Sequence, residues 1–134
     1  RWRDLPGELQ PAGRHIATET QRTDAAIAAL EAEDPRRLGS LVDESHRSLS
    51  TDYRISTERL DAMTAAARRV PGCYGARIVG GGFGGSALAL VDRAAAGACA
   101  AAMAAASRPD AGTWLIEPAA GVAALATDVV TAPG

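Results

Sequence analysis

Six consecutive residues, Gly80-Gly81-Gly82-Phe83-Gly84-Gly85, constrain the fold more than any other segment of the chain. Five of them lack a Cβ atom, so the backbone here can adopt positive φ angles that other residues avoid. Apolar runs flank this glycine loop on both sides, at residues 76–79 and 87–91. Because such runs separated by turn residues are typical of paired strands, we expect a β-hairpin closed by the glycine loop.

Composition limits the remaining possibilities. The 134 residues are 47% hydrophobic and 22% charged, which is typical of a single globular domain. The net charge of −2 provides no basic surplus for nucleic acid. The longest apolar stretch, residues 94–106, is shorter than the roughly 20 residues of a bilayer span, and no signal-peptide pattern is recognisable. We therefore expect one cytoplasmic domain over residues 1–134 that binds neither nucleic acid nor membrane.

All 14 basic residues are Arg, so this chain cannot itself supply a phosphate-binding or Schiff-base lysine. Cys73 and Cys99 are isolated in the sequence and match no zinc spacing, which favours free thiols over a disulfide or a metal site.

Helical periodicity predicts three helices before the hairpin and one after it. The first is expected over residues 14–33. The second begins at Asp34-Pro35, the third begins at Ser56-Thr57-Glu58 and ends at Pro71-Gly72, and the fourth covers the alanine-rich residues 94–106. The residues expected on one face of the first three helices are Ile16, Thr20, Thr23, Ile27 and Leu30, then Leu38, Leu41, Val42, Ser45 and Leu49, then Leu60, Met63, Thr64 and Ala67.

After a turn at residues 108–112, residues 113–117 have the β-branched and aromatic character of a third strand, with Trp114 in the core. Residues 129–131 are a weaker candidate for an edge strand. The order of elements predicts an α+β fold, with helices packed on one face of a small antiparallel sheet.

Two interpretations of the glycine loop follow from its residues alone. Successive N–H groups of such a loop can form a concave site for a phosphate, or the loop can be a permissive hairpin turn. Gly80, Gly82 and Gly85 also satisfy G-x-G-x-x-G, but a dinucleotide site needs the loop to lead into a helix. Here a strand pattern follows, so we reject a dinucleotide site.

A longer resemblance surrounds the loop. Residues 75–86, Gly-Ala-Arg-Ile-Val-Gly-Gly-Gly-Phe-Gly-Gly-Ser, resemble the third motif of the GHMP small-molecule kinases in its galactokinase form. Residues 14–22 resemble the family's R-H-V-x-x-E-x-x-R stretch, and residues 39–49 resemble its G-x-L-M-x-x-S-H-x-S-L segment. Residues 52–61 resemble D-Y-x-V-S followed by E-L-D. These matches keep the family's order over more than half of the chain.

The resemblance implies a GHMP kinase C-terminal domain with a ferredoxin-like fold. It also implies a kinase that transfers the γ-phosphoryl group of ATP to the anomeric hydroxyl of galactose, with Mg²⁺, in a cleft between two domains. The family's sugar-recognition segment, catalytic Asp and Ser-rich phosphate loop do not occur in this sequence. We therefore expect a missing N-terminal kinase domain as partner, no catalytic or metal-binding residue in this chain, and no activity from the chain alone.

The same resemblance assigns the glycine loop to the nucleotide phosphates and places Ser45 and His46 near the cleft. Adjacent residues of a helix point about 100° apart, so we do not expect these two to act as a nucleophile and its base. Arg77 could bind a phosphate or form a salt bridge in the sheet. His15 and Glu19 could hold a metal or form a surface hydrogen bond.

Three positions depart from the family's pattern. Val79 replaces its Thr, Ser86 its Cys and Arg59 its Glu, and the change at Val79 leaves open whether the loop is tuned as in an active enzyme. Two alternatives to a galactokinase remain: a non-catalytic module of the same fold that binds or senses sugar or nucleotide, and a GHMP kinase for another substrate. A face that normally meets a missing domain is expected to be apolar, so the isolated chain is expected to self-associate.

Overall fold

The computed structural model describes residues 1–108 and 111–118. Within these residues the element order is three α-helices, a β-hairpin and a fourth α-helix, with short 3-10 turns at residues 2–4, 7–9 and 93–95. The helices and strands are α1 Gln10–Glu31, α2 Pro35–Thr51, α3 Glu58–Arg68, β1 Cys73–Val79, β2 Ser86–Val91 and α4 Ala96–Ala105. The predicted α+β class and the predicted order of helices and hairpin are confirmed.

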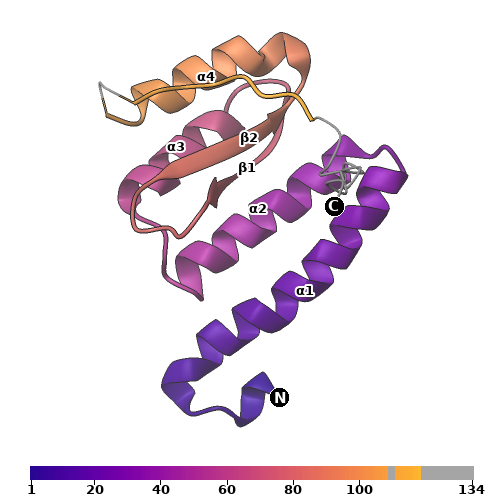
Figure 1. The fold of residues 1–134 in the computed structure, drawn as a ribbon, viewed down its shortest axis with the longest axis vertical. Coiled ribbons are helices and arrows are strands. Elements are labelled where there is room, and N and C mark those ends of the chain that lie inside the picture. Colours follow the sequence, from indigo (N-terminus) through magenta and orange to yellow (C-terminus); the bar gives the residue numbers. More distant parts are fainter. Residues whose placement is uncertain (109–110, 119–134) are drawn as a thin grey trace, which may run out of the picture.

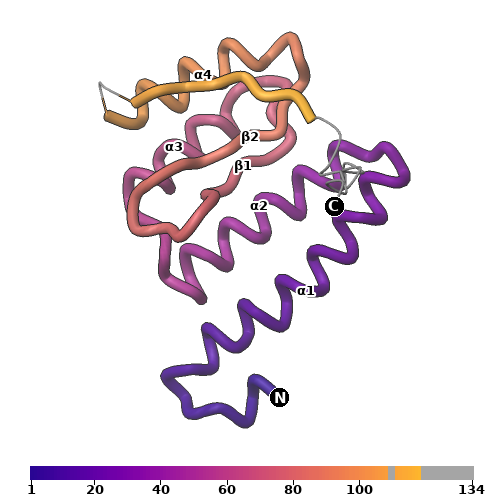
Figure 2. The backbone as a smooth tube through the Cα atoms, viewed as in Figure 1, coloured from indigo at the N-terminus to yellow at the C-terminus, as the bar shows by residue number. Residues whose placement is uncertain are grey.

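The elements lie side by side around the hairpin. Figure 1 shows α1 beside α2, α2 beside the hairpin, and α3 and α4 along the hairpin. Figure 2 shows the chain reversing at the loop between the two strands and reversing again to enter α4. α1 packs on α2, α2 and α3 both contact β1, and α3 and α4 contact each other and β2. The hairpin is therefore held by helices that come both before and after it in the sequence.

α1 starts at Gln10, earlier than the predicted Arg14. Pro11 lies in its first turn, where the missing N–H group removes no helical hydrogen bond. α2 and α3 begin as predicted: the Asp34 side chain accepts from the Arg37 N–H, and the Thr57 side chain accepts from the Leu60 N–H. Local capping chemistry therefore sets these two starts.

The core consists of two adjoining clusters of small and medium side chains. One contains Ala67, Ala76, Cys99 and Met103, and the other contains Leu49, Leu60 and Ile78. Most residues predicted on the inner faces of α2 and α3 are buried, namely Leu41, Ser45, Leu49, Leu60, Thr64 and Ala67, and the others are half-buried. Both cysteines are free, as predicted, and burial raises the pKa of the Cys99 thiol to about 11.

The predicted inner face of α1 is wrong. Ile16, Ile27 and Leu30 are 61%, 51% and 61% exposed, whereas His15 and Ala29 are buried against the rest of the chain. The helix packs through its small and polar residues because several of those polar groups find partners on α2 and β1. The apolar stripe consequently faces outward.

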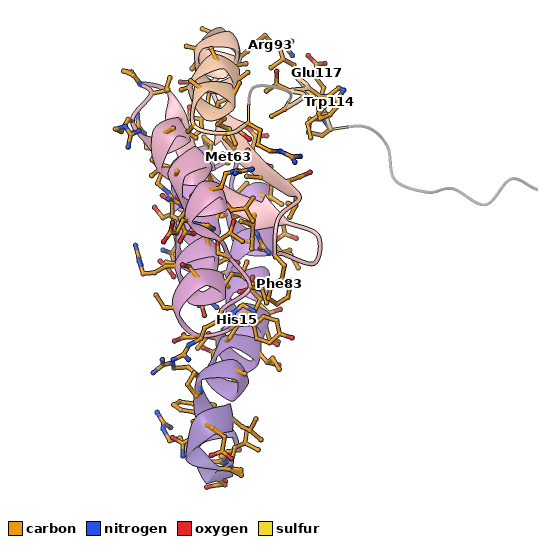
Figure 3. All side chains as sticks on the ribbon, turned by 90° about the vertical axis from the view of Figure 1, so that its left-hand side faces the viewer. His15, Met63, Phe83, Arg93, Trp114 and Glu117 are labelled. Atoms are coloured by element: carbon orange, nitrogen blue, oxygen red, sulfur yellow. The ribbon has the colours of Figure 1, made fainter. Side chains whose placement is uncertain are left out.

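The predicted third strand is also wrong. Residues 113–117 form no ladder with the hairpin, and Trp114 is 78% exposed and not part of the core. Figure 3 shows Trp114 and Glu117 at one side of the helical body near Arg93, to which Glu117 is ion-paired. The candidate edge strand at residues 129–131 lies outside the described residues.

Two glycines bring α2 onto the backbone of β1. A Cβ atom on Gly39 would lie 2.1 Å from the Tyr74 carbonyl oxygen, and one on Gly75 would lie 2.1 Å from the Gly39 carbonyl oxygen. Real Cβ atoms do not approach backbone oxygens so closely, so this helix–strand contact requires glycine on both sides. It brings α2 close along the open edge of β1.

Side chains bond three of the backbone groups on that edge. The strands pair antiparallel with Ala76 opposite Ala89 and Ile78 opposite Ala87. Asp43 accepts the Ala76 N–H at 2.8 Å, Arg68 donates to the Ala76 carbonyl, and Arg77 donates to the Ile78 carbonyl. Arg68 is also ion-paired with Asp43.

The opposite edge of the hairpin differs. In an antiparallel pair, residues opposite each other either both bond across the ladder or both point away from it. Because Ala76 and Ile78 point away from β2, their partners Ala89 and Ala87 direct their own backbone groups to the far edge. Within the part of the chain that the structure describes, those groups form no hydrogen bond outside the hairpin.

No helix among the described residues combines the length and the apolar character of a bilayer span.

Candidate functional site

The glycine loop closes the hairpin with five residues in the left-handed region. The φ angles of Gly80, Gly82, Gly84 and Gly85 are 79°, 77°, 127° and 89°. Phe83 has a φ of 55° although it carries a bulky side chain, which is a strained conformation for such a residue. Its ring is nevertheless 76% exposed and contributes little to the core. The strain at Phe83 is therefore not offset by burial of its side chain.

A contact with the connector between α2 and α3 fixes the loop. The Phe83 N–H donates to the Ile55 carbonyl at 2.7 Å. A Cβ atom on Gly82 would lie 2.3 Å from the same carbonyl oxygen, so only glycine allows this approach. The loop is thus held beside the start of α3.

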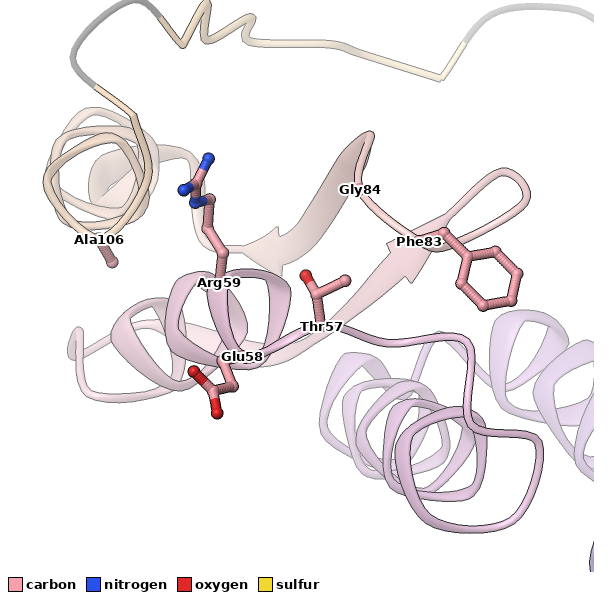
Figure 4. Close-up of a pocket in the computed structure, with 6 residues that line it drawn as sticks. All are labelled: Thr57, Glu58, Arg59, Phe83, Gly84 and Ala106. Carbon is pink, nitrogen blue, oxygen red and sulfur yellow. The ribbon is translucent and has the colours of Figure 1, made fainter.

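An open hollow of about 670 Å³ lies between the loop and that helix start. Its lining, shown in Figure 4, consists of Thr57, Glu58, Arg59, Phe83, Gly84 and Ala106. The N-terminus of α3 contributes the positive end of a helix dipole, and Arg59 contributes a guanidinium group. Arg59 is one of the three departures from the family's pattern, so the charge reversal falls at the hollow.

Most amides of the loop have no acceptor. Within the described residues, the N–H groups of Gly81, Gly82, Gly84 and Gly85 donate to no backbone or side-chain oxygen, while the intervening Phe83 N–H is used by Ile55. A run of unpaired N–H groups in a turn with positive φ angles can bind an anion. The loop therefore presents the free N–H donors that an anion site needs, and the binding of a phosphate to them stays a prediction.

Ser45 and Arg77 meet at Glu19. The Ser45 hydroxyl donates to Glu19 Oε1 at 2.6 Å, and Arg77 Nη1 lies 3.3 Å from the same oxygen. Arg22 donates to the other oxygen at 2.9 Å. Burial raises the pKa of Glu19, but the hydrogen bonds from Ser45 and Arg22 and the charges of Arg22 and Arg77 bring it below its ordinary value. A carboxylate thus joins α1, α2 and β1, and Arg77 forms a salt bridge.

His46 points to a different element. Its Nε2 lies 2.9 Å from Thr64 Oγ1 and 3.2 Å from Asp61 Oδ1, both on α3. Its Nδ1 is buried and has no hydrogen-bond partner among the described residues. Burial and the charge of Arg68 lower the pKa of His46, so the ring is neutral near pH 7. Ser45 and His46 therefore do not form a nucleophile and base pair with each other.

His15 is buried, and its Nδ1 lies 3.0 Å from the Ser48 hydroxyl. It stacks on Tyr53 with ring centroids 4.8 Å apart, and burial lowers its pKa. Asp52 accepts from Ser48 and from Arg14, whose guanidinium holds the pKa of Asp52 below its usual range. The predicted surface hydrogen bond between His15 and Glu19 is replaced by this buried network.

Sequence reasoning missed Asp43, Arg68 and the contact between Gly39 and Gly75. No local pattern marks a residue whose partners lie far away in the sequence. Arg68 and Ala76, which both bond to Asp43, lie 25 and 33 positions after it.

Among the described residues no group of three or more His, Cys, Asp or Glu side chains is placed to hold a metal ion.

Comparison with known proteins gives a consistent answer. The family described as GHMP kinases C terminal matches residues 26–108, which include α2, α3, the hairpin and α4. Since this match covers more than half of the chain, the chain belongs to the GHMP kinase family and represents its C-terminal domain. Within that family its sequence and fold are galactokinase-like.

The individual relatives are galactokinases. The galactokinase of Chloroflexus aggregans is 50% identical over 88 residues, and that of Homo sapiens is 49% identical over 83 residues. These matches cover 66% and 62% of this chain but only 23% and 21% of the relatives, so the chain spans about a quarter of their length. The solved structure of Lactococcus lactis galactokinase complexed with galactose superposes with a TM-score of 0.72 and 34% identity, over 77% of this chain and 26% of that protein.

Proposed function

We propose that residues 1–134 form the C-terminal domain of an ATP-dependent galactokinase, which works with an N-terminal kinase domain. The observation that carries the proposal is the glycine loop. Four of its N–H groups have no acceptor in the described part of the chain, and it lies beside a hollow lined also by Arg59 and the start of α3. The galactokinase relatives, whose length is about four times the matched region, support the need for a second domain.

In the proposed reaction the anomeric hydroxyl oxygen of galactose forms a bond to the γ-phosphorus of ATP. The bond between that phosphorus and the β,γ-bridging oxygen breaks, ADP leaves, and the hydroxyl proton passes to a base. Phosphoryl transfer depends mainly on positioning and on stabilising the charge of the phosphoryl oxygens. We assign the base and the sugar-binding groups to the N-terminal domain.

The role of this chain would be to hold the anionic part of the nucleotide. The N–H groups of Gly81, Gly82, Gly84 and Gly85 would donate to phosphate oxygens, with the dipole of α3 adding to their effect. The contact of Phe83 with Ile55 would keep those amides in place before ATP binds. Arg77 would help to position the strand that enters the loop and would not bind phosphate itself, because its guanidinium is already paired with Glu19.

The Mg²⁺ that accompanies ATP in kinases has no set of ligands among the residues that the structure describes. The described residues bring no three potential ligands together, so we assign the ion to no residue here and derive no step from it. We place the enzyme in the cytoplasm, where ATP is available.

The loop assignment can be tested on the chain by itself. In an NMR titration with ATP, and with inorganic triphosphate as a simpler probe, the amide signals of Gly81, Gly82, Gly84 and Gly85 are expected to shift most. Gly84→Ala should weaken binding, because Gly84 has a φ of 127°. Gly97→Ala is the matched control, since Gly97 lies on the exposed side of α4 with no atom within 4 Å of an added Cβ. Shifts distributed without regard to the loop would contradict the assignment.

The galactokinase assignment needs the second domain. A chimera can be made from the galactokinase of Chloroflexus aggregans by replacing its matched C-terminal region with this chain. The chimera is expected to release ADP from ATP in the presence of galactose, and the chain alone is expected to release none. ADP release by the chimera with another sugar and none with galactose would reject the galactose assignment. A chain that binds ATP but supports no turnover in the chimera would favour the non-catalytic binding module.

A further inference from the structure

The two cysteines of the chain meet in the core, and the proposed kinase role uses neither of them. Cys73 is the first residue of β1, and Cys99 lies in the first turn of α4. Both thiols are free, and Cys73 packs against the buried cluster that contains Cys99. A strand and a helix that are separated by the whole hairpin thus each bring a thiol to the same place.

The spacing of buried residues shows which side of α4 faces Cys73. Ala95, Cys99 and Met103 follow one another at intervals of four residues and are 8%, 2% and 8% exposed. Residues four apart lie on the same side of a helix, so Cys99 is on the inner side of α4. Ala95 also lies against Gly72, the residue before Cys73, since a Cβ atom on Gly72 would be 2.8 Å from the Ala95 Cβ.

The backbone around the two thiols is held together independently of them. The Asp92 N–H donates to the Gly72 carbonyl at 2.8 Å, which ties the entry of β1 to the exit of β2. The register of the two strands shifts between Cys73 and Gly75. Cys73 therefore lies beyond the regular part of the ladder, so a small movement of its side chain toward α4 need not disturb the pairing that follows.

The two thiols differ in access and in acidity. Cys73 is half-buried and donates to the Gly75 carbonyl at 3.8 Å, whereas Cys99 is fully buried. Burial raises the pKa of both thiols, that of Cys99 to about 11, and the hydrogen bond between the two thiols opposes this rise at Cys73. Because the thiolate is the reactive form, a dissolved oxidant meets Cys73 first.

We propose that Cys73 and Cys99 are a reversible oxidation site, which forms a disulfide between β1 and α4 on exposure to a small disulfide such as oxidised glutathione. The inference goes beyond the proposed kinase role, since neither cysteine belongs to the glycine loop or lines its hollow. Disulfides of cytosolic proteins are usually transient, so an excess of reduced glutathione returns the site to two thiols.

The oxidation takes two exchange steps. The Cys73 thiolate attacks one sulfur of oxidised glutathione, the bond between the two glutathione sulfurs breaks, and one glutathione leaves as a thiolate that takes up a proton. The Cys99 thiolate then attacks the Cys73 sulfur, and the bond from that sulfur to the remaining glutathione breaks. The chain gives up two electrons and two protons, which the two released glutathione thiols carry.

Equilibration of the full chain with mixtures of oxidised and reduced glutathione at about pH 8 tests the site. By mass spectrometry the oxidised chain is expected to lack two hydrogen atoms and to resist alkylation. The oxidised-to-reduced ratio gives an effective concentration of one thiol at the other. It should be about tenfold or more higher in the folded chain than in urea, because the fold holds the thiols in contact. An equal or lower value in the folded chain, or disulfides formed only between chains, overturns the proposal.

Single substitutions test the order of the two steps. Cys99→Ala should accumulate a glutathione adduct at Cys73, because the thiol that completes the exchange is missing. Cys73→Ala should form an adduct far more slowly, because Cys99 is buried. In urea the two variants should react at similar rates, so a difference without urea reports the effect of the fold. An adduct that forms faster at Cys99 than at Cys73 in the folded variants would overturn the assigned order.

Discussion

Glu19 on α1 and Arg77 on β1 are 58 residues apart in the sequence and form an ion pair, with 3.3 Å between Oε1 and Nη1. Arg77 lies three positions before the glycine loop, so this pair connects the first helix of the chain to the strand that leads into the candidate site. Ser45 donates to the same carboxylate oxygen from α2. The ion pair therefore joins α1 to the strand that enters the candidate site.

Glu19→Gln is expected to destabilise the fold by about 1–2 kcal/mol, because three donors lose a charged acceptor while the shape is kept. Chemical denaturation at pH 7 measures this change. Glu44→Gln is the matched control: Glu44 is 43% exposed, and its nearest approach to Arg37 is 3.9 Å, so an effect below about 0.5 kcal/mol is expected. Equal losses in the two variants would mean that the Glu19 network does not stabilise the fold.

The same carboxylate predicts a loss of stability in acid. The pKa of Glu19 is lower in the folded state than in the unfolded chain, so its contribution is present above the unfolded value of about 4.3. It is lost as the pH falls through the folded value. The unfolding free energy of the natural chain should therefore decrease more steeply below about pH 4 than that of Glu19→Gln. Parallel pH profiles of the two proteins would contradict this assignment.

The two histidines predict a second pH effect in a higher range. Burial lowers the pKa of both His15 and His46 below the ordinary value of about 6.5. Below that value the unfolded chain binds more protons than the folded one, so stability falls as the pH decreases from about 6.5 toward the folded values. Denaturation profiles between about pH 7.5 and 5.5 measure the slope, which should be shallower when both histidines are replaced by Gln.

Gly39→Ala is expected to destabilise the chain by about 1–3 kcal/mol or more, because the new methyl group would overlap the Tyr74 carbonyl. Gly97→Ala on α4 should stabilise it by up to about 1 kcal/mol, since that position is open and alanine favours a helix. Thermal unfolding of the two variants compares them directly. A neutral Gly39→Ala would mean that α2 can move away from β1 at little cost.

Asp43→Ala removes the acceptor of the Ala76 N–H and the partner of Arg68. A loss of about 2–4 kcal/mol is expected, because a buried amide loses its acceptor and a partly buried guanidinium loses its counter-ion. Hydrogen exchange at the Ala76 amide should accelerate more than global unfolding accounts for. Asp24→Ala, an exposed carboxylate without an ion pair among the described residues, should change stability by less than about 0.5 kcal/mol.

Local chemistry made α2, α3 and the hairpin predictable. Asp34 and Thr57 cap their helices through bonds to residues three positions ahead, and glycines in the loop adopt the positive φ angles that a tight reversal needs. Such features depend on neighbours in the sequence, so a sequence pattern contains them. The order of family-like motifs added the fold class and the galactokinase relationship, both of which the comparisons support.

Long-range polar contacts were not predictable. Hydrophobic periodicity assigned Ile16 and Ile27 to the inner face of α1, whereas His15 and Glu19 occupy that side because Ser48, Ser45 and Arg77 supply their partners. The prediction of a strand at residues 113–117 was wrong for a related reason. Strand propensity describes a fit to a neighbouring strand, and none pairs with these residues here.

The two edges of the hairpin consequently differ in whether a further strand can pair with them. Asp43, Arg68 and Arg77 already bond the Ala76 N–H, the Ala76 carbonyl and the Ile78 carbonyl, and α2 lies close along that side. Among residues 1–108 and 111–118, the outward amides and carbonyls of Ala87 and Ala89 on the other side bond to nothing outside the hairpin. Any extended segment that enlarges this sheet, whether from a longer polypeptide or from a separate molecule, has a single direction of approach and must align with β2.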